Sequence, residues 1–220
     1  MKNIIISLFD FSGSWSKPYR EAGYEVIQID IKLKTDILEW DYKQIDKSRV
    51  YGILAACPCT DFTRLSAQHW KEKDLTGQTA KSISLVKKTL EIIKYLNPDF
   101  WVIENPPGRI EKCVPELKNY KLFSFNPFDF GDNYAKLTLL YGCFNPWLIQ
   151  KPTKPLIRNK SVKSGGGNTS MEKYLNINYP GFSKLSFKGM QELRSITPAG
   201  FSRAFFEANN NLKEIEKCKT

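Results

Sequence analysis

The chain has 220 residues, of which 41% are hydrophobic and 13% aromatic, so it can bury the core of one α/β domain and is not disordered by composition. No apolar run approaches the roughly 20 residues that cross a bilayer, which argues against a membrane protein and predicts a cytoplasmic one. The formal charge of +10, from 33 basic and 23 acidic residues, favours a polyanionic partner.

Strands and helices are predicted to alternate in the first half of the chain. Four apolar runs are typical of strands, over 4–9, 25–29, 51–56 and 100–103. Helices are predicted over 17–22 and over 79–96, where apolar residues recur at steps of three and four. Two later strands, over 122–125 and 137–144, are expected to extend the sheet in the antiparallel sense. The pattern predicts a doubly wound, mostly parallel sheet with its binding crevice at the carboxyl ends of the strands.

The second half of the chain changes in composition. Residues 152–185 are rich in Lys, Pro, Gly, Ser and Asn and have no helical or strand period, whereas 190–193 and 200–208 are predicted helices. We therefore expect one α/β domain over 1–150, a small loop-rich segment over 151–187, and helices over 188–220 that return to the domain.

The five cysteines are odd in number, with Cys57 and Cys59 one residue apart, which is not typical of a disulfide framework. The one histidine, His69, has no partner at a ligand spacing, and no second close pair of cysteines exists. We therefore expect no metal site.

Small and polar residues follow the first two predicted strands. The turn over 11–15, Phe-Ser-Gly-Ser-Trp, allows a ligand to approach the backbone closely, and the helix N-terminus after it suits a carboxylate or phosphate. Asp30 ends the second strand, where an acid accepts hydrogen bonds from ribose hydroxyls in nucleoside-binding folds. Gly/Ser turns and turn aspartates are common, so it is their combination that indicates a cofactor site.

A thiol and a carboxyl follow the next two strands. Cys59 comes after Pro58, and Glu104 comes after the strand over 100–103. The two strand ends are neighbours in a doubly wound sheet, so a nucleophile and an acid could face one pocket. Cys57 continues an apolar run and is expected to be a small buried hydrophobe.

Three blocks in this order resemble the conserved blocks of the cytosine-5 DNA methyltransferases: Phe11-Ser12-Gly13-Ser14, Pro58-Cys59-Thr60 and Glu104-Asn105-Pro106. The likeness is closest to the short members found in phages and mobile elements. It covers 2–147 and resumes over 196–209. It implies a fold of the S-adenosylmethionine-dependent methyltransferase type, S-adenosylmethionine as cofactor, and double-stranded DNA as partner. We expect the protein to act as a monomer. By the same resemblance, 1–150 would be the catalytic domain and 151–187 a small target-recognition segment.

The resemblance also assigns the cofactor contacts. The turn over 11–15 would hold the methionine end, Asp30 the ribose, and Ile31 and 36–37 the adenine. The full set that the family implies is Phe11, Ser12, Gly13, Ser14, Trp15, Asp30, Ile31, Asp36, Ile37 and Pro58.

In the same family, the cysteine of this block attacks carbon 6 of cytosine, and the glutamate hydrogen-bonds ring nitrogen 3 and the exocyclic amine. These roles would fall to Cys59 and Glu104, acting on a base flipped out of the duplex. A later block departs from the family, because Lys136 and Thr138 stand where two arginines are usual. Lys136 keeps a positive charge near the cytosine but lacks the forked geometry of arginine.

Contacts to DNA are expected from basic residues and from the loop after the cysteine. No acidic residue occurs from Asn133 to Met171, although a solvated loop would also explain that stretch. The small recognition segment predicts short or relaxed sequence specificity and salt-dependent affinity. The expected contacts are Arg64, His69, Lys151, Lys154, Arg158, Lys160 and Lys163.

Three alternatives stay open. The element Asn105-Pro106-Pro107 is similar to one in amino-group methyltransferases, although Gly108 follows it where those enzymes carry an aromatic residue. A homologue that binds DNA or cofactor without catalysis would explain the altered arginine block. An RNA substrate would keep the same chemistry.

Overall fold

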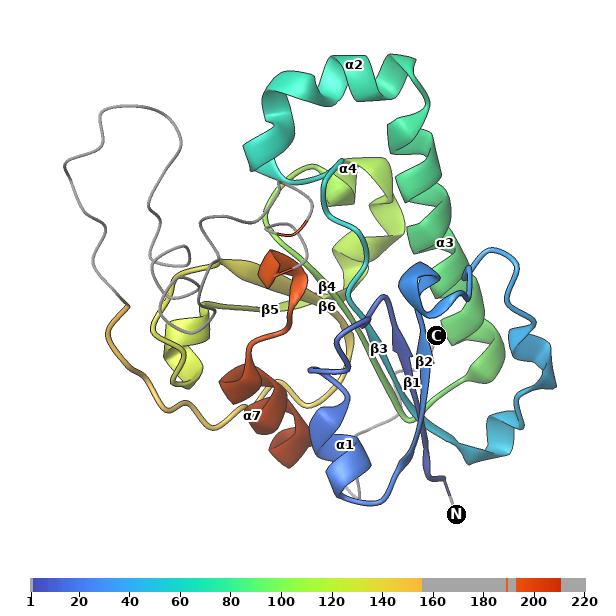
Figure 1. Ribbon diagram of the computed structural model, residues 1–220, viewed down its shortest axis with the longest axis vertical. Coiled ribbons are helices and arrows are strands. Elements are labelled where there is room, and N and C mark those ends of the chain that lie inside the picture. The colour runs from blue at the N-terminus through green and yellow to red at the C-terminus, as the bar shows by residue number, and fades with distance from the viewer. Residues whose placement is uncertain (1, 156–188, 190–192, 211–220) are drawn as a thin grey trace.

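The computed structural model describes residues 2–155, 189 and 193–210. Its centre is a six-stranded sheet of order β2-β1-β3-β4-β6-β5 (Figure 1). The strands are β1 Ile4–Leu8, β2 Glu25–Ile29, β3 Val50–Ala55, β4 Phe100–Asn105, β5 Lys121–Phe125 and β6 Thr138–Cys143. The predicted doubly wound, mostly parallel sheet is confirmed.

The direction of one strand differs from the prediction. Strands β1 to β4 pair in parallel, and β6 is antiparallel to both β4 and β5. Strand β5 therefore runs in the same direction as β1 to β4, and the expectation that both late strands are antiparallel holds for β6 alone. The apolar pattern of 122–125 predicts a strand, but the direction depends on the connection before it.

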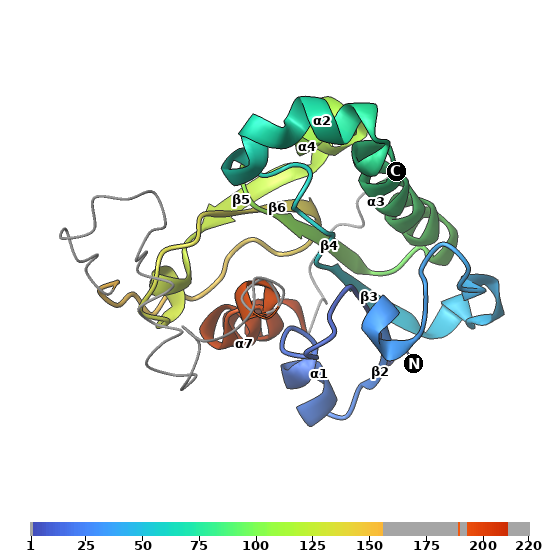
Figure 2. The same cartoon turned by 45° about the horizontal axis from the view of Figure 1, so that its top comes forward.

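Helices cover both faces of this sheet (Figure 2). The long helix α3, Gln78–Leu96, lies on one face, and α1 and α7 lie together on the other. The α-helices are α1 Lys17–Glu21, α2 Trp70–Leu75, α3 Gln78–Leu96, α4 Ile110–Cys113 and α7 Ala199–Asn209. Short 3-10 helices occupy Ile31–Leu33, Tyr42–Gln44, Lys47–Arg49, Arg64–His69, Pro115–Tyr120 and Pro127–Phe130.

Alternation along the buried strands builds two different cores. In β1, Ile4, Ile6 and Leu8 pack into a mainly aliphatic cluster with the inner face of α3, whereas Ile5 packs into an aromatic cluster on the opposite face. In the aromatic cluster, Phe201 of α7 stacks on Phe125 of β5 with ring centroids 4.0 Å apart. Burial of these aromatic rings ties α7 to the domain.

Most of the predicted recognition segment over 151–187 lies outside the described residues, and so does 190–192. The predicted helix over 200–208 is α7.

Cys57, Cys59 and Cys113 are free thiols, and Cys143 is disulfide-bonded. In the part of the chain that the structure describes, no helix is long and apolar enough to cross a membrane.

Candidate active site

The carboxyl ends of β1 to β4 meet at one edge of the sheet, because these strands run in parallel. The turn after β1, Asp30 after β2, Cys59 after β3 and Glu104 in β4 therefore lie along this edge. Antiparallel β6 begins at the same edge, which brings Lys136, two residues before it, into the same region. The sheet thus gathers residues that are far apart in sequence.

Cys59, Glu104 and Lys136 interact with one another. The Lys136 ammonium nitrogen lies 3.7 Å from Glu104 Oε1 and donates a hydrogen bond to the Arg194 carbonyl at 3.2 Å. The Glu104 and Lys136 side chains are 14% and 20% exposed, so their attraction is only partly screened. Burial raises the pKa of the Cys59 thiol, the positive charge of Lys136 opposes that rise, and Glu104 adds to it. A thiol, a carboxyl and an ammonium thus lie close enough to act on one another.

Cys57 has a different environment. It is 3% exposed, and its sulfur lies 3.7 Å from Thr89 Oγ1. Burial raises the pKa of this thiol to about 12. Cys57 is therefore a small buried hydrophobe, as its place in the apolar run predicts, and it is not a nucleophile near neutral pH.

The loops that carry Cys59 and Glu104 are joined by backbone contacts. Thr63 and Gly108 form an antiparallel bridge, and the Arg109 amide donates to the Phe62 carbonyl at 2.8 Å. A Cβ atom on Gly108 would lie 1.8 Å from the Phe62 carbonyl oxygen, so this approach requires glycine. The two loops therefore form one unit.

The Asn105 side chain is buried. Its Nδ2 donates to the Cys57 carbonyl at 3.1 Å, and the residue has no exposed surface. Its Oδ1 has no hydrogen-bond partner among the described residues.

One organising residue was missed by the sequence analysis, namely Asp10. Its carboxylate is 4% exposed and accepts hydrogen bonds from Ser7 Oγ at 2.9 Å, Ser12 Oγ at 3.2 Å, and the amide and hydroxyl of Ser16 at 3.2 and 3.0 Å. Gly13, at φ 68°, closes the turn by donating its amide to the Asp10 carbonyl. The available signal was an acid directly after a buried strand, followed by three alternating serines.

The turn lies beside a cavity of about 540 Å³ that the C-terminal segment helps to line. The Ser14 hydroxyl donates to the Thr197 carbonyl at 2.8 Å, which ties the turn to the residues before α7. The cavity is lined by Ser12, Gly13, Ser14, Lys17, Arg20, Glu21 and Ile196.

Apolar side chains are exposed at the ends of β1 and β2. Phe11 is 48% exposed and Ile31 is 70% exposed. The carboxylate of Asp30 is fixed, because its Oδ1 accepts a hydrogen bond from the Lys32 amide at 2.8 Å. Two exposed apolar groups and a fixed carboxylate form a surface suited to a nucleoside.

Other predicted cofactor residues have side chains that are buried or partly buried. The Trp15 ring is fully buried in the aromatic core, 5.9 Å from the ring of Phe201, so only its backbone is available to a ligand. Ile37 is 3% exposed within the aliphatic core, and the Asp36 carboxylate caps the Leu38 amide at 2.9 Å. Pro58 is half-buried.

The predicted DNA contacts within the described residues are all exposed: Arg64, His69, Lys151 and Lys154. Arg64 and His69 belong to the 3-10 helix that follows the Cys59 loop. His69 Nδ1 lies 3.7 Å from Glu72 Oε2, and both side chains are at the surface. Arg158, Lys160 and Lys163 lie outside the described residues.

The parallel sheet, the turn built on Asp10 and the carboxylate after β2 define a class of protein, an α/β fold of the S-adenosylmethionine-dependent methyltransferase type. No protein-family model matches this chain. The protein named "Probable DNA (cytosine-5)-methyltransferase" from Frog virus 3 (isolate Goorha) is 29% identical over 145 residues, which are 60% of this chain and 67% of the viral protein. Over this stretch the chain is similar to a protein that is named for cytosine-5 methylation of DNA.

Solved structures give partial likenesses. The methyltransferase EhMeth of Entamoeba histolytica is 17% identical, with a TM-score of 0.46, over 71% of this chain and 58% of its own. The Dnmt2 methyltransferase of S. pombe is 16% identical, with a TM-score of 0.43, over 64% of this chain and 49% of its own. The chain thus spans 58% and 49% of the lengths of these two proteins.

Proposed function

We propose that this chain transfers a methyl group from S-adenosylmethionine to carbon 5 of cytosine in DNA. The observation that carries the proposal is the free thiol of Cys59, on which the charges of both Glu104 and Lys136 act. The viral relative is named for the same reaction.

The residues around the β1 and β2 ends fit S-adenosylmethionine. The Asp10-built turn and the cavity beside Ser14 suit the polar methionine end, and the Asp30 carboxylate suits the ribose hydroxyls. The exposed Phe11 and Ile31 offer apolar contacts to the adenine. When bound, the cofactor supplies an electrophilic methyl group on a sulfonium.

Cys59 makes the base reactive. Its thiolate sulfur would bond to carbon 6 of cytosine, and the electron pair of the 5,6 double bond would move to carbon 5. Carbon 5 would then take the methyl group as the methyl–sulfur bond of the sulfonium breaks, which leaves S-adenosylhomocysteine. Loss of the carbon 5 proton to a base returns an electron pair, re-forms the 5,6 double bond and expels the sulfur. Cysteine is thereby regenerated for the next turnover.

Glu104 and Lys136 manage the charge on the ring. Glu104 hydrogen-bonds ring nitrogen 3 and the exocyclic amine, so that negative charge moving onto the ring is neutralised. Lys136, held 3.7 Å from Glu104, supplies positive charge to the thiolate before attack.

The substrate strand must present its cytosine outside the base stack, because the thiolate cannot reach carbon 6 of a base stacked within the duplex. The net charge of +10 supports binding through phosphates, and the affinity is expected to fall steeply with salt. The expected specificity is short or relaxed.

The test uses tritiated S-adenosylmethionine with mixed-sequence duplex DNA, followed by digestion to nucleosides. We expect label in 5-methylcytosine with the natural protein and none with Cys59→Ser. Cys57→Ser is the matched control and should keep activity, because its sulfur faces Thr89 in the core.

Other outcomes would contradict the proposal in distinct ways. Label in N4-methylcytosine or N6-methyladenine would rule out the cytosine-5 mechanism. Label only in a parallel reaction with folded RNA would change the substrate. Cofactor and DNA binding without label would indicate a binding protein that does not catalyse.

A further inference from the structure

Arg109 contacts the segment that follows Cys59, although it lies on the loop that follows Glu104. Its Nε donates to the Asp61 carbonyl at 2.9 Å, two residues after the nucleophile. Asn105, the last residue of β4, donates to the Cys57 carbonyl at 3.1 Å, two residues before Cys59. The residues after Glu104 therefore hold the backbone on both sides of Cys59.

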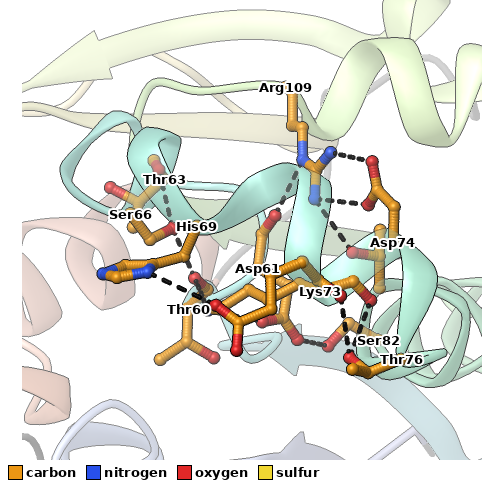
Figure 3. Close-up of polar contacts among 12 residues, drawn as sticks. Thr60, Asp61, Thr63, Ser66, His69, Lys73, Asp74, Thr76, Ser82 and Arg109 are labelled. Carbon is orange, nitrogen blue, oxygen red and sulfur yellow. Dashed lines mark hydrogen bonds and ion pairs between the residues drawn. The ribbon is translucent and has the colours of Figure 1, made fainter.

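Arg109 is itself fixed by an unusual number of partners (Figure 3). Its guanidinium makes a two-point contact with the Asp74 carboxylate, both distances 2.8 Å, and donates to Thr79 Oγ1 at 2.9 Å. The same group lies over the Trp70 ring, 4.7 Å from its centre. The Arg109 side chain is only 11% exposed, although the Asp74 side chain is 50% exposed, so the contacts of Arg109 with the Asp61 carbonyl and Thr79 are better shielded from solvent than its ion pair.

The side chain of Asp61 completes the cluster from the opposite side. Its Oδ1 lies 2.7 Å from the Lys73 ammonium, and its Oδ2 accepts from Ser82 in α3. Burial alone would raise the pKa of Asp61, but the Lys73 and Ser82 hydrogen bonds outweigh it and lower that pKa. The residue two places after the nucleophile is thus anchored through both its carbonyl and its carboxylate.

We propose that Arg109 is a positioning residue, which sets the sulfur of Cys59 at the reacting distance from a cytosine held by Glu104. The geometric reason is that one base must meet both side chains at once, on carbon 6 and on nitrogen 3. Arg109 joins the two loops through a rigid fork, and Lys at this position could not serve Asp61, Asp74 and Thr79 together. The reaction-rate part of this proposal rests on the proposed function.

Two readouts test the proposal. The first is the single-turnover rate of covalent attachment to duplex DNA that carries 5-fluorocytosine, measured with Arg109→Met and Arg109→Lys. Misplacement of a reacting group by about 1 Å costs on the order of 100-fold, so Arg109→Met should lose about that factor at unchanged DNA affinity. Arg109→Lys should recover only a small part of it.

The second readout needs no activity. Iodoacetamide alkylates a thiolate by displacement of iodide, and mass spectrometry assigns each modified cysteine. Arg109→Met removes the hydrogen bond to the Asp61 carbonyl, which should open the Cys59 segment and speed alkylation of Cys59 roughly tenfold, with Cys57 unchanged.

Arg49→Met is the matched control, since Arg49 pairs with Glu25 and Asn3 at the opposite edge of the sheet. It should change neither readout. The proposal is overturned if Arg109→Met leaves the alkylation of Cys59 unchanged, or if Cys57 is exposed to the same degree. If the unsubstituted protein forms no adduct with the DNA, the proposed function is contradicted. Faster alkylation of Cys59 alone in Arg109→Met would still support the positioning role.

Discussion

The two halves of the carboxyl edge of the sheet are held in different ways. On the base side, the Cys59 and Glu104 loops are joined by a backbone bridge and by the buried fork of Arg109. On the cofactor side, one buried carboxylate, Asp10, holds the turn, and apolar Phe11 and Ile31 stay exposed beside it. The contacts on the base side therefore fix the distance between the Cys59 and Glu104 loops, whereas the cofactor side is a preformed but open surface.

The sharpest test of the base side is Glu104→Gln. The amide keeps the size of the side chain but cannot neutralise the charge that develops on the ring, so kcat should fall about 100- to 1,000-fold. Cofactor affinity should stay within about twofold, since Glu104 lies on the other half of the edge. Titration with S-adenosylhomocysteine measures cofactor affinity, and single-turnover methylation measures the rate. A tenfold loss of cofactor affinity would contradict the separation of the base side from the cofactor side.

Gly108→Ala tests the bridge between the two loops. The added Cβ would lie 1.8 Å from the Phe62 carbonyl, so the loops must separate, at a cost of about 1–3 kcal/mol, with a large loss of activity. Gly23→Ala is the control, because Gly23 has a φ of 87° but open space around it. It should cost about 1–2 kcal/mol without loss of activity per folded molecule. Urea unfolding and methylation rates measure both, and equal activity losses would contradict the account.

Asp10→Asn tests the cofactor side. A neutral amide cannot accept all four hydrogen bonds from the serines, so the turn should loosen, with stability falling by about 1–3 kcal/mol and cofactor affinity by about tenfold. Asp30→Asn is matched to it, since asparagine caps the following turn as well as aspartate does and stability should not change. Calorimetry with S-adenosylhomocysteine should then show reduced affinity for both variants. Unchanged affinity in Asp30→Asn would remove this residue from the cofactor site.

The smallest effect is expected from the charge of Lys136, and it depends on pH. Burial raises the pKa of Cys59 and Lys136 opposes that rise, so the thiolate fraction and the rate should increase as the pH rises. Lys136→Met removes the opposing charge and should move the rising limb of the rate profile to higher pH. Lys136→Arg keeps the charge and should leave the limb in place. A limb that does not move in Lys136→Met would show that this charge does not act on the thiol.

Sequence patterns predicted the sheet and the residues at its strand ends, because buried strands show continuous apolar runs and their ends carry the polar residues. The family resemblance implied that Lys136 brings a positive charge near the cytosine, and the structure places its ammonium 3.7 Å from Glu104. Trp15 shows the limit of such inference. It is adjacent to Ser14 in sequence, yet its ring points into the core, because neighbouring residues in a turn face different ways.

The clamp of Arg109 could not be predicted from the sequence. Asp61 and Asp74 lie 48 and 35 residues before it, and their approach depends on how the segment over 64–77 folds back on the Glu104 loop. The direction of β5 is hidden for a similar reason, since composition does not fix the path of the chain between strands. Long-range polar contacts and strand direction both require the tertiary structure.

The assignment of Cys59 as the nucleophile is tested most directly by mapping the covalent adduct between the protein and DNA. Fluorine at carbon 5 cannot leave as a proton, so a protein that attacks carbon 6 stays attached to 5-fluorocytosine DNA after methyl transfer. We predict that digestion and mass spectrometry will find the DNA on Cys59, only in the presence of S-adenosylmethionine. Attachment through Cys57 or Cys113, or no attachment by a protein that methylates cytosine, would contradict the assignment of Cys59 as the nucleophile.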